Sequence, residues 1–142
     1  MTEVAFHFNV PDRLAYACRL IRKAVGQGVR LVVLADGADA SRLDQLLWTF
    51  SAREFIAHCS LPAHADVAAA SAVLIGGEPA QWPHSQVMLN LGMRVPAGFE
   101  RFERLIELVT GDDDDRHHAR ERWRHYAARG YPIVRHDVSA RG

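Results

Sequence analysis

The feature that most constrains the fold of this chain is a strand, helix, strand succession near its amino end. Apolar residues alternate with other residues over 4–10, which is the period-two pattern of a β-strand. From Asp12, a possible N-cap, apolar residues recur at helical spacing until the glycines at 26–28 end the helix. The nearly continuous apolar run 29–35 is typical of a strand buried on both faces of a parallel sheet. The chain therefore begins with a βαβ unit.

The same alternation of elements continues to the carboxyl end. A second helix is predicted after the turn at Asp36, with Asp39 or Ser41 as its cap and its end near Ser51. The further elements that the patterns predict are strands at 55–57, 72–75 and 87–91, helices over 99–109 and 112–129, and a last strand at 131–134.

The pattern as a whole predicts one α/β domain over residues 1–142. No internal repeat, low-complexity linker or change in composition divides the chain. Alternating strands and helices favour an open, mostly parallel, Rossmann-like sheet in a three-layer arrangement.

Composition limits the partners and the compartment. The 17 basic residues balance 17 acidic ones, so the protein as a whole has no charge that would draw it to nucleic acid or to an anionic membrane. Cys18 and Cys59 lie far apart, outside any metal-binding or redox spacing. The start of the chain lacks a signal-peptide pattern, and no apolar run approaches a membrane span. We therefore expect a cytoplasmic protein without a membrane partner.

The loops that follow the predicted strands carry no catalytic or cofactor motif. The segments NVPDR and ADGADAS lack a phosphate-binding glycine pattern, and Gly76-Gly77 is followed by a turn and not by a helix. No nucleophile elbow and no placed Cys and His pair occurs. We expect no cofactor and no enzymatic activity. The alternative, a small nucleotide-binding or hydrolytic α/β enzyme, stays open because a fold does not fix a function.

Metal binding is also not expected. The eight histidines lack the spacing and the third ligand of a zinc site. The four aspartates at 112–115 begin a predicted helix, where the helix dipole favours negative charge.

The predicted helix at 112–129 carries the most informative surface. Arg116, Arg120 and Arg124 fall within an arc of about 80° on one helical face, with Trp123 and Ala127 beside them. Guanidiniums next to an aromatic ring suit an acidic peptide that ends in a hydrophobic residue. A solvated face that pairs with the acidic residues of the same helix is the other interpretation, and the spacing does not decide between them.

Two segments resemble the characteristic segments of a known family. RLDQLLWTFSAREFIAH at 42–58 and ARERWRHYAARGY at 119–131 are similar to those of the chi subunit of bacterial DNA polymerase III, and the length and order of elements match along nearly the whole chain. The resemblance implies a non-catalytic adaptor that joins the clamp loader to DNA coated with single-stranded DNA-binding protein. One surface would hold the psi subunit, and the other the acidic, Phe-terminated tail of the binding protein.

The resemblance also implies which residues form each surface. Those of the tail-binding site are Arg116, Arg120, Trp123 and Arg124, with Val109 as an apolar wall. Those of the psi-binding surface are Trp48 and Phe55, although each of these two could by itself equally be core. The family commonly has lysines where Arg116 and Arg124 stand and a tyrosine at the position of Trp123. The partner at the second surface could also be a diverged psi, the loader itself or a helicase-like protein. Tight binding of naked DNA is not expected.

Overall fold

A single seven-stranded sheet organises the protein. The computed structural model describes residues 1–49 and 56–141. The elements, in chain order, are β1 Glu3–Val10, α1 Arg13–Gly26, β2 Leu31–Leu34, α2 Gly37–Thr49, β3 His58–Ser60, α3 Ala65–Ala70, β4 Val73–Ile75, η1 Pro79–Gln81, β5 Val87–Asn90, η2 Phe99–Arg101, β6 Arg104–Thr110, α4 Asp113–Ala128, β7 Ile133–Asp137 and η3 Val138–Arg141. The strands follow the order β3-β4-β2-β5-β6-β1-β7, and every neighbouring pair is parallel.

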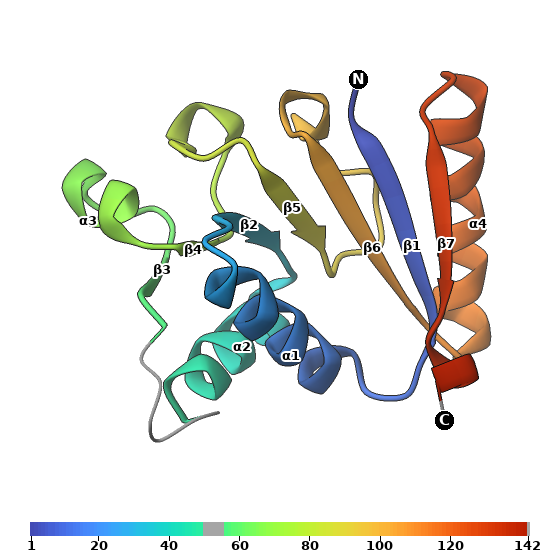
Figure 1. Ribbon diagram of the computed structural model, residues 1–142, viewed down its shortest axis with the longest axis horizontal. Helices are drawn as coiled ribbons and strands as arrows, with labels where there is room; N and C mark the ends of the chain where they lie inside the picture. The colour runs from blue at the N-terminus through green and yellow to red at the C-terminus, as the bar shows by residue number, and fades with distance from the viewer. Residues whose placement is uncertain (50–55, 142) are drawn as a thin grey trace.

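Helices cover both faces of this sheet, which confirms the predicted open α/β architecture in three layers. On one face, Ala17, Cys18 and Ile21 of α1 and Leu43 and Leu47 of α2 form a buried cluster with side chains of the central strands. Figure 1 shows α1 and α2 side by side in front of the sheet, while α4 runs along the β1 and β7 side. On the opposite face, Ala68 of α3 and Ala119 and Tyr126 of α4 join a second buried cluster.

The first helix begins where the sequence predicted. The side chain of Asp12 accepts a hydrogen bond from the backbone N–H of Ala15 at 3.1 Å, as an N-cap does.

The connection from β6 to β7 passes through α4, which crosses over β1 because β1 lies between those two strands. This crossover places α4 over β6 and β1, next to the edge strand β7.

The predicted helix over 99–109 is wrong. Residues 99–101 form only the short η2, and β6 then occupies the interior of the sheet between β5 and β1. Both faces of β6 are covered, with Leu105 and Val109 in one buried cluster and Leu108 in the other. A strand that is apolar on both faces has no period-two alternation, and its residues can fall by chance at helical spacing.

Other differences concern element boundaries. Strand β3 spans 58–60, so the strand predicted at 55–57 lies too early, although residues 50–55 are outside the described part of the chain. Helix α2 already begins at Gly37, so Asp39 and Ser41 lie inside the helix and do not cap it. The short helix α3 was not predicted, and β7 starts at Ile133, two residues later than expected. No helix among the described residues is both long and apolar enough to cross a membrane.

Substitution of Gly77, compared with substitution of Gly28 in another loop, tests how tightly the loop after β4 is packed. Gly77 has φ +90°, and a Cβ there would lie 2.5 Å from Leu61 Cδ1, whereas Gly28 has φ +78° with nothing within 4 Å. We expect Gly77→Ala to lower the free energy of unfolding by about 2–4 kcal/mol, since backbone strain and overpacking add. Gly28→Ala should lower it by about 1–2 kcal/mol, from strain alone. Urea denaturation measures both, and equal losses would show that the contact with Leu61 relaxes freely.

Candidate protein-binding surfaces

Helix α4 begins with a set of acidic residues that serve the helix itself. The side chain of Asp112 accepts a hydrogen bond from the backbone N–H of Asp115 at 3.0 Å, and Asp113 and Asp114 lie in the first turn. Capping and negative charge at this end both stabilise a helix. The acidic run is therefore accounted for by the start of α4, as the sequence predicted.

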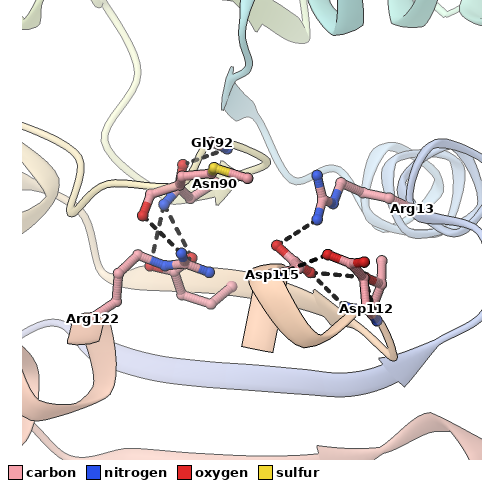
Figure 2. Close-up of polar contacts among 9 residues, drawn as sticks. Arg13, Asn90, Gly92, Asp112, Asp115 and Arg122 are labelled. Atoms are coloured by element: carbon pink, nitrogen blue, oxygen red, sulfur yellow. Dashed lines mark hydrogen bonds and ion pairs between the residues drawn. The ribbon is translucent and has the colours of Figure 1, made fainter. Parts of the chain in front are cut away.

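Asp115 ties this helix start to two other elements. Its Oδ2 accepts hydrogen bonds from the N–H and the hydroxyl of Thr110 at 2.8 and 2.9 Å, and its Oδ1 lies 2.6 Å from Arg13 Nη2 (Figure 2). Burial by itself would raise the pKa of Asp115, but the hydrogen bonds from Thr110 and the charge of Arg13 outweigh it and lower that pKa. The first turn of α4 is thus fixed to the end of β6 and to the start of α1.

A second, fully buried contact holds the middle of α4 against the sheet. Glu107 on β6 is 0% exposed and accepts hydrogen bonds from Arg122 Nε at 3.0 Å, Tyr126 Oη at 2.5 Å and Asn90 Nδ2 at 3.0 Å. Arg122 also donates through Nη1 to the carbonyl of Met93 at 2.9 Å. Figure 2 shows Arg122 and Asn90 converging on this point, well apart from Asp115. The network joins α4 to β5, β6 and the loop that follows β5.

Burial changes the acidity of this carboxyl group. Desolvation raises the pKa of Glu107 to about 7, against the opposing effect of the Arg122 charge and of the hydrogen bonds from Tyr126, Asn90 and Arg122. The pKa of the Tyr126 phenol is also raised, first by burial and then by the neighbouring carboxyl group.

Sequence reasoning missed this network, although a signal was present. Arg122 lies about 160° around the helix from the middle of the arginine arc, on the side of Ala119 and Tyr126. An arginine at a core position needs a buried acidic partner, and Glu107 is the acidic residue within the apolar run of β6. Because residues 99–109 were predicted to be a helix, Glu107 was not expected on an interior strand that faces Arg122.

The three arginines of the predicted site share an exposed face of α4, here called the arginine face. Arg116, Arg120 and Arg124 are all exposed, and none of them forms an ion pair with a carboxylate of the described residues. Glu121 instead lies 3.1 Å from His117. The arginine face is therefore not a self-neutralised helix surface.

Trp123 borders the arginine face and is half-buried. Its ring centroid lies 5.0 Å from that of Phe6, and its ring is 5.8 Å from Arg135 Cζ on β7. Val109 belongs to the same buried cluster but is only 6% exposed. Trp123 packs against the cluster to which Val109 belongs, but its ring contacts are with Phe6 and Arg135. Trp123 and Phe8 are only partly buried, and both rings lie near the Arg135 guanidinium, so they offer the apolar surface of this region.

The residues predicted for the second surface lie at the end of α2. Trp48 is 57% exposed, which excludes the core position that was its alternative. Its ring centroid lies 4.7 Å from that of buried His58, whose Nδ1 donates to the carbonyl of Ile56 at 2.7 Å and whose Nε2 is 3.3 Å from Asp44 Oδ1. Phe55, the other predicted residue, lies outside the described residues.

Comparison with known proteins identifies the family. The family described as "DNA polymerase III chi subunit, HolC" matches residues 1–134. The chain belongs to this family. A relative from Pseudomonas aeruginosa, "DNA polymerase III subunit chi", is 37% identical over 142 residues, which cover 96% of this chain and 96% of the relative.

Membership in the chi family confirms the resemblance seen in the sequence. A chi subunit is an accessory part of the DNA polymerase III holoenzyme and not its catalytic part, so the alternative of a small α/β enzyme is set aside. Among the described residues, no group of three or more potential ligands is placed to hold a metal ion.

The buried carboxyl group of this chi-family chain predicts a pH dependence of stability. The pKa of Glu107 is raised from 4.5 to about 7, so the folded protein binds a proton that the unfolded chain has lost. Its stabilising contribution is complete below pH 4.5 and is lost as the pH rises to 7. The Glu107→Gln variant has an amide in place of the carboxyl group, and an amide does not titrate between pH 4.5 and pH 7. We therefore expect the free energy of unfolding of the wild type, minus that of Glu107→Gln, to fall from pH 4.5 to pH 7.

Denaturant titrations at several pH values measure this difference. Glu103→Gln changes an exposed carboxyl group one residue before β6 and serves as the matched control. A difference that rises with pH over this range would contradict the expected effect of burial.

Proposed function

We propose that the arginine face of α4 binds the acidic carboxyl-terminal tail of single-stranded DNA-binding protein, and that the surface around Trp48 binds the psi subunit. The chain would then link the clamp loader to DNA coated with that binding protein, in the cytoplasm. Family membership supports this role, because Trp48 and, on the arginine face, Arg120 and Arg124 lie in the two segments that resemble the chi family.

The observation that carries the proposal is that three exposed guanidiniums lie together on one helix face without carboxylate partners among the described residues. Arg116, Arg120 and Arg124 have no carboxylate partner among the described residues, although the protein as a whole is neutral. Clustered guanidiniums that lack an internal partner are suited to carboxylates from another molecule, because each can form a bidentate pair. The half-buried ring of Trp123 beside them offers an apolar contact for a hydrophobic end residue.

The size of these contacts suggests a transient complex. Hydrogen bonds to charged groups contribute about 1.5–3 kcal/mol each, and a buried Phe side chain contributes about 1.5–3 kcal/mol. Ordering a flexible tail opposes both. We therefore expect a binding free energy near −8 kcal/mol, which corresponds to about micromolar affinity.

Naked DNA fits the same helix less well than an acidic peptide. The exposed carboxylates of Asp112, Asp113 and Asp114 lie at the start of the helix that carries the arginines, and they would repel phosphates. A short peptide can place its carboxylates on Arg120 and Arg124, which lie about one and two turns beyond Arg116 and away from that end. This difference favours an indirect link to DNA through its protein coat.

Isothermal titration calorimetry with a peptide of the cognate tail tests the first surface. We expect Arg120→Ala, and separately removal of the terminal Phe from the peptide, to weaken binding at least about tenfold, from loss of one charge-assisted contact and of one buried side chain. Arg19→Ala changes an exposed arginine of α1 and should bind as the wild type does. Raising the salt from about 0.05 to 0.5 M should also weaken binding. Unchanged affinity in all these cases would refute the assignment.

Substitution of Trp48 tests the second surface. We expect Trp48→Ala to weaken binding of the cognate psi subunit by about 2 kcal/mol or more, since exposed aromatic residues often dominate an interface. Thermal stability should change little because Trp48 as a whole is 57% exposed. Val67 on α3 is 50% exposed, and Val67→Ala is the control that should bind normally. Surface plasmon resonance gives the affinities, and full binding by Trp48→Ala would place the psi contact elsewhere.

A further inference from the structure

We infer that Arg135 on the edge strand β7 completes the tail-binding surface as a fourth guanidinium, which binds a carboxylate of the acidic tail from the side opposite the helix arginines. The inference rests on the proposed function of α4 and adds a second structural element to that site. Neither the spacing of residues on α4 nor the resemblance to the family pointed to this residue.

The position of Arg135 follows from the sheet. Strand β7 pairs only with β1 among the described strands, and Arg135 lies opposite Phe6 in that pairing. Successive side chains of a strand point to opposite faces, and Arg135 points to the face that α4 covers, because its Cζ lies 5.8 Å from the Trp123 ring. Its Cζ also lies 5.5 Å from the ring of Phe8 on β1. The guanidinium is thus held by two aromatic rings from two different elements.

This arrangement fixes the guanidinium without satisfying its charge. Arg135 is exposed, and its guanidinium forms no ion pair or hydrogen bond with another described residue. The nearest acidic residue along β7, Asp137, accepts hydrogen bonds from Asn9 Nδ2 at 3.0 Å and from the hydroxyl of Ser139 at 2.7 Å. An arginine that contacts aromatic rings loses little freedom when it binds, and its N–H groups remain able to hold a carboxylate in a bidentate pair.

Trp123 connects Arg135 to the arginine face. Trp123 is one residue before Arg124 and three residues after Arg120 on the same helix. Its ring also contacts the Arg135 guanidinium. A peptide that lies across Trp123 would therefore meet guanidiniums from α4 on one side and from β7 on the other. Cations on two elements can hold two carboxylates of one extended segment, which favours a tail with several acidic residues.

Calorimetry with the full chain and the cognate tail peptide tests this inference. We expect Arg135→Ala to weaken binding about three- to tenfold, the range for a charge-assisted contact that is partly exposed. The matched control is Arg19→Ala, because the Arg19 Cζ lies 5.9 Å from the Tyr16 ring and so provides the same kind of contact on α1. That variant should bind as the wild type does. Thermal unfolding of each variant checks that the fold is retained.

Two altered peptides separate a carboxylate contact from an effect on the position of Trp123. One has its acidic side chains replaced by amides, and the other has an amidated carboxyl end. If Arg135 binds a carboxylate, Arg135→Ala will weaken binding of at least one altered peptide less than it weakens binding of the native peptide. An equal loss with all three peptides would overturn the inference, because Arg135 would then act only through Trp123.

The outcomes distinguish this inference from the proposed function. If Arg120→Ala weakens binding while Arg135→Ala behaves as Arg19→Ala does, the inference is wrong and the tail site on α4 stands. If neither Arg120→Ala nor Arg135→Ala weakens binding, the tail site itself is wrong, and the inference falls with it.

Discussion

The ion pair between Glu107 and Arg122 is the contact on which the arrangement of α4 depends. A carboxyl group on an interior strand and a guanidinium on the helix are both almost completely removed from water, so the guanidinium depends on this carboxyl group as its buried acidic partner. Tyr126 and Asn90 supply the remaining hydrogen bonds to the carboxylate. Such a contact tolerates little rotation of the helix, because a turn about its axis would leave a charge buried without a partner. The opposite side of α4 is thereby directed to solvent.

Because the helix is fixed in this way, some arginines near it pair with buried carboxyl groups and others are exposed without such a partner. Arg122 forms a buried ion pair with Glu107, and Arg13 on α1 forms an ion pair with Asp115 at the helix start. Arg116, Arg120 and Arg124 remain without a carboxylate among the described residues. A neutral protein thus presents a local positive surface, because the acidic residues nearest to it serve other contacts: Asp112 caps the helix, and Asp115 and Glu107 pair with Arg13 and Arg122. Recognition by charge depends on this distribution and not on the net charge.

The same structure explains why the usual ligand site of an open parallel sheet is not where we place the function. In such sheets ligands commonly bind at the carboxyl ends of the strands, through glycine-rich loops and helix starts. Here the loop after β5 accepts a hydrogen bond from Arg122, and the loop after β6 leads into a helix start that Asp112 and Asp115 already occupy. These segments stabilise α4, whereas the arginine face, Arg135 and Trp48 are exposed.

The sequence by itself predicted the α/β class, an open and mostly parallel sheet, the start of α4 and the resemblance to the family, because these depend on local periodicity, capping residues and characteristic short segments. It also identified Arg116, Arg120 and Arg124 as one face, since helical spacing is a local property. Only the tertiary structure decided that 104–110 is a strand, that Trp48 is exposed, and that Arg122 pairs with Glu107. It alone brought Arg135 to Trp123. Each of these results depends on which strands are neighbours in the sheet, and contacts between residues distant in the sequence leave no periodic pattern from which they could be predicted.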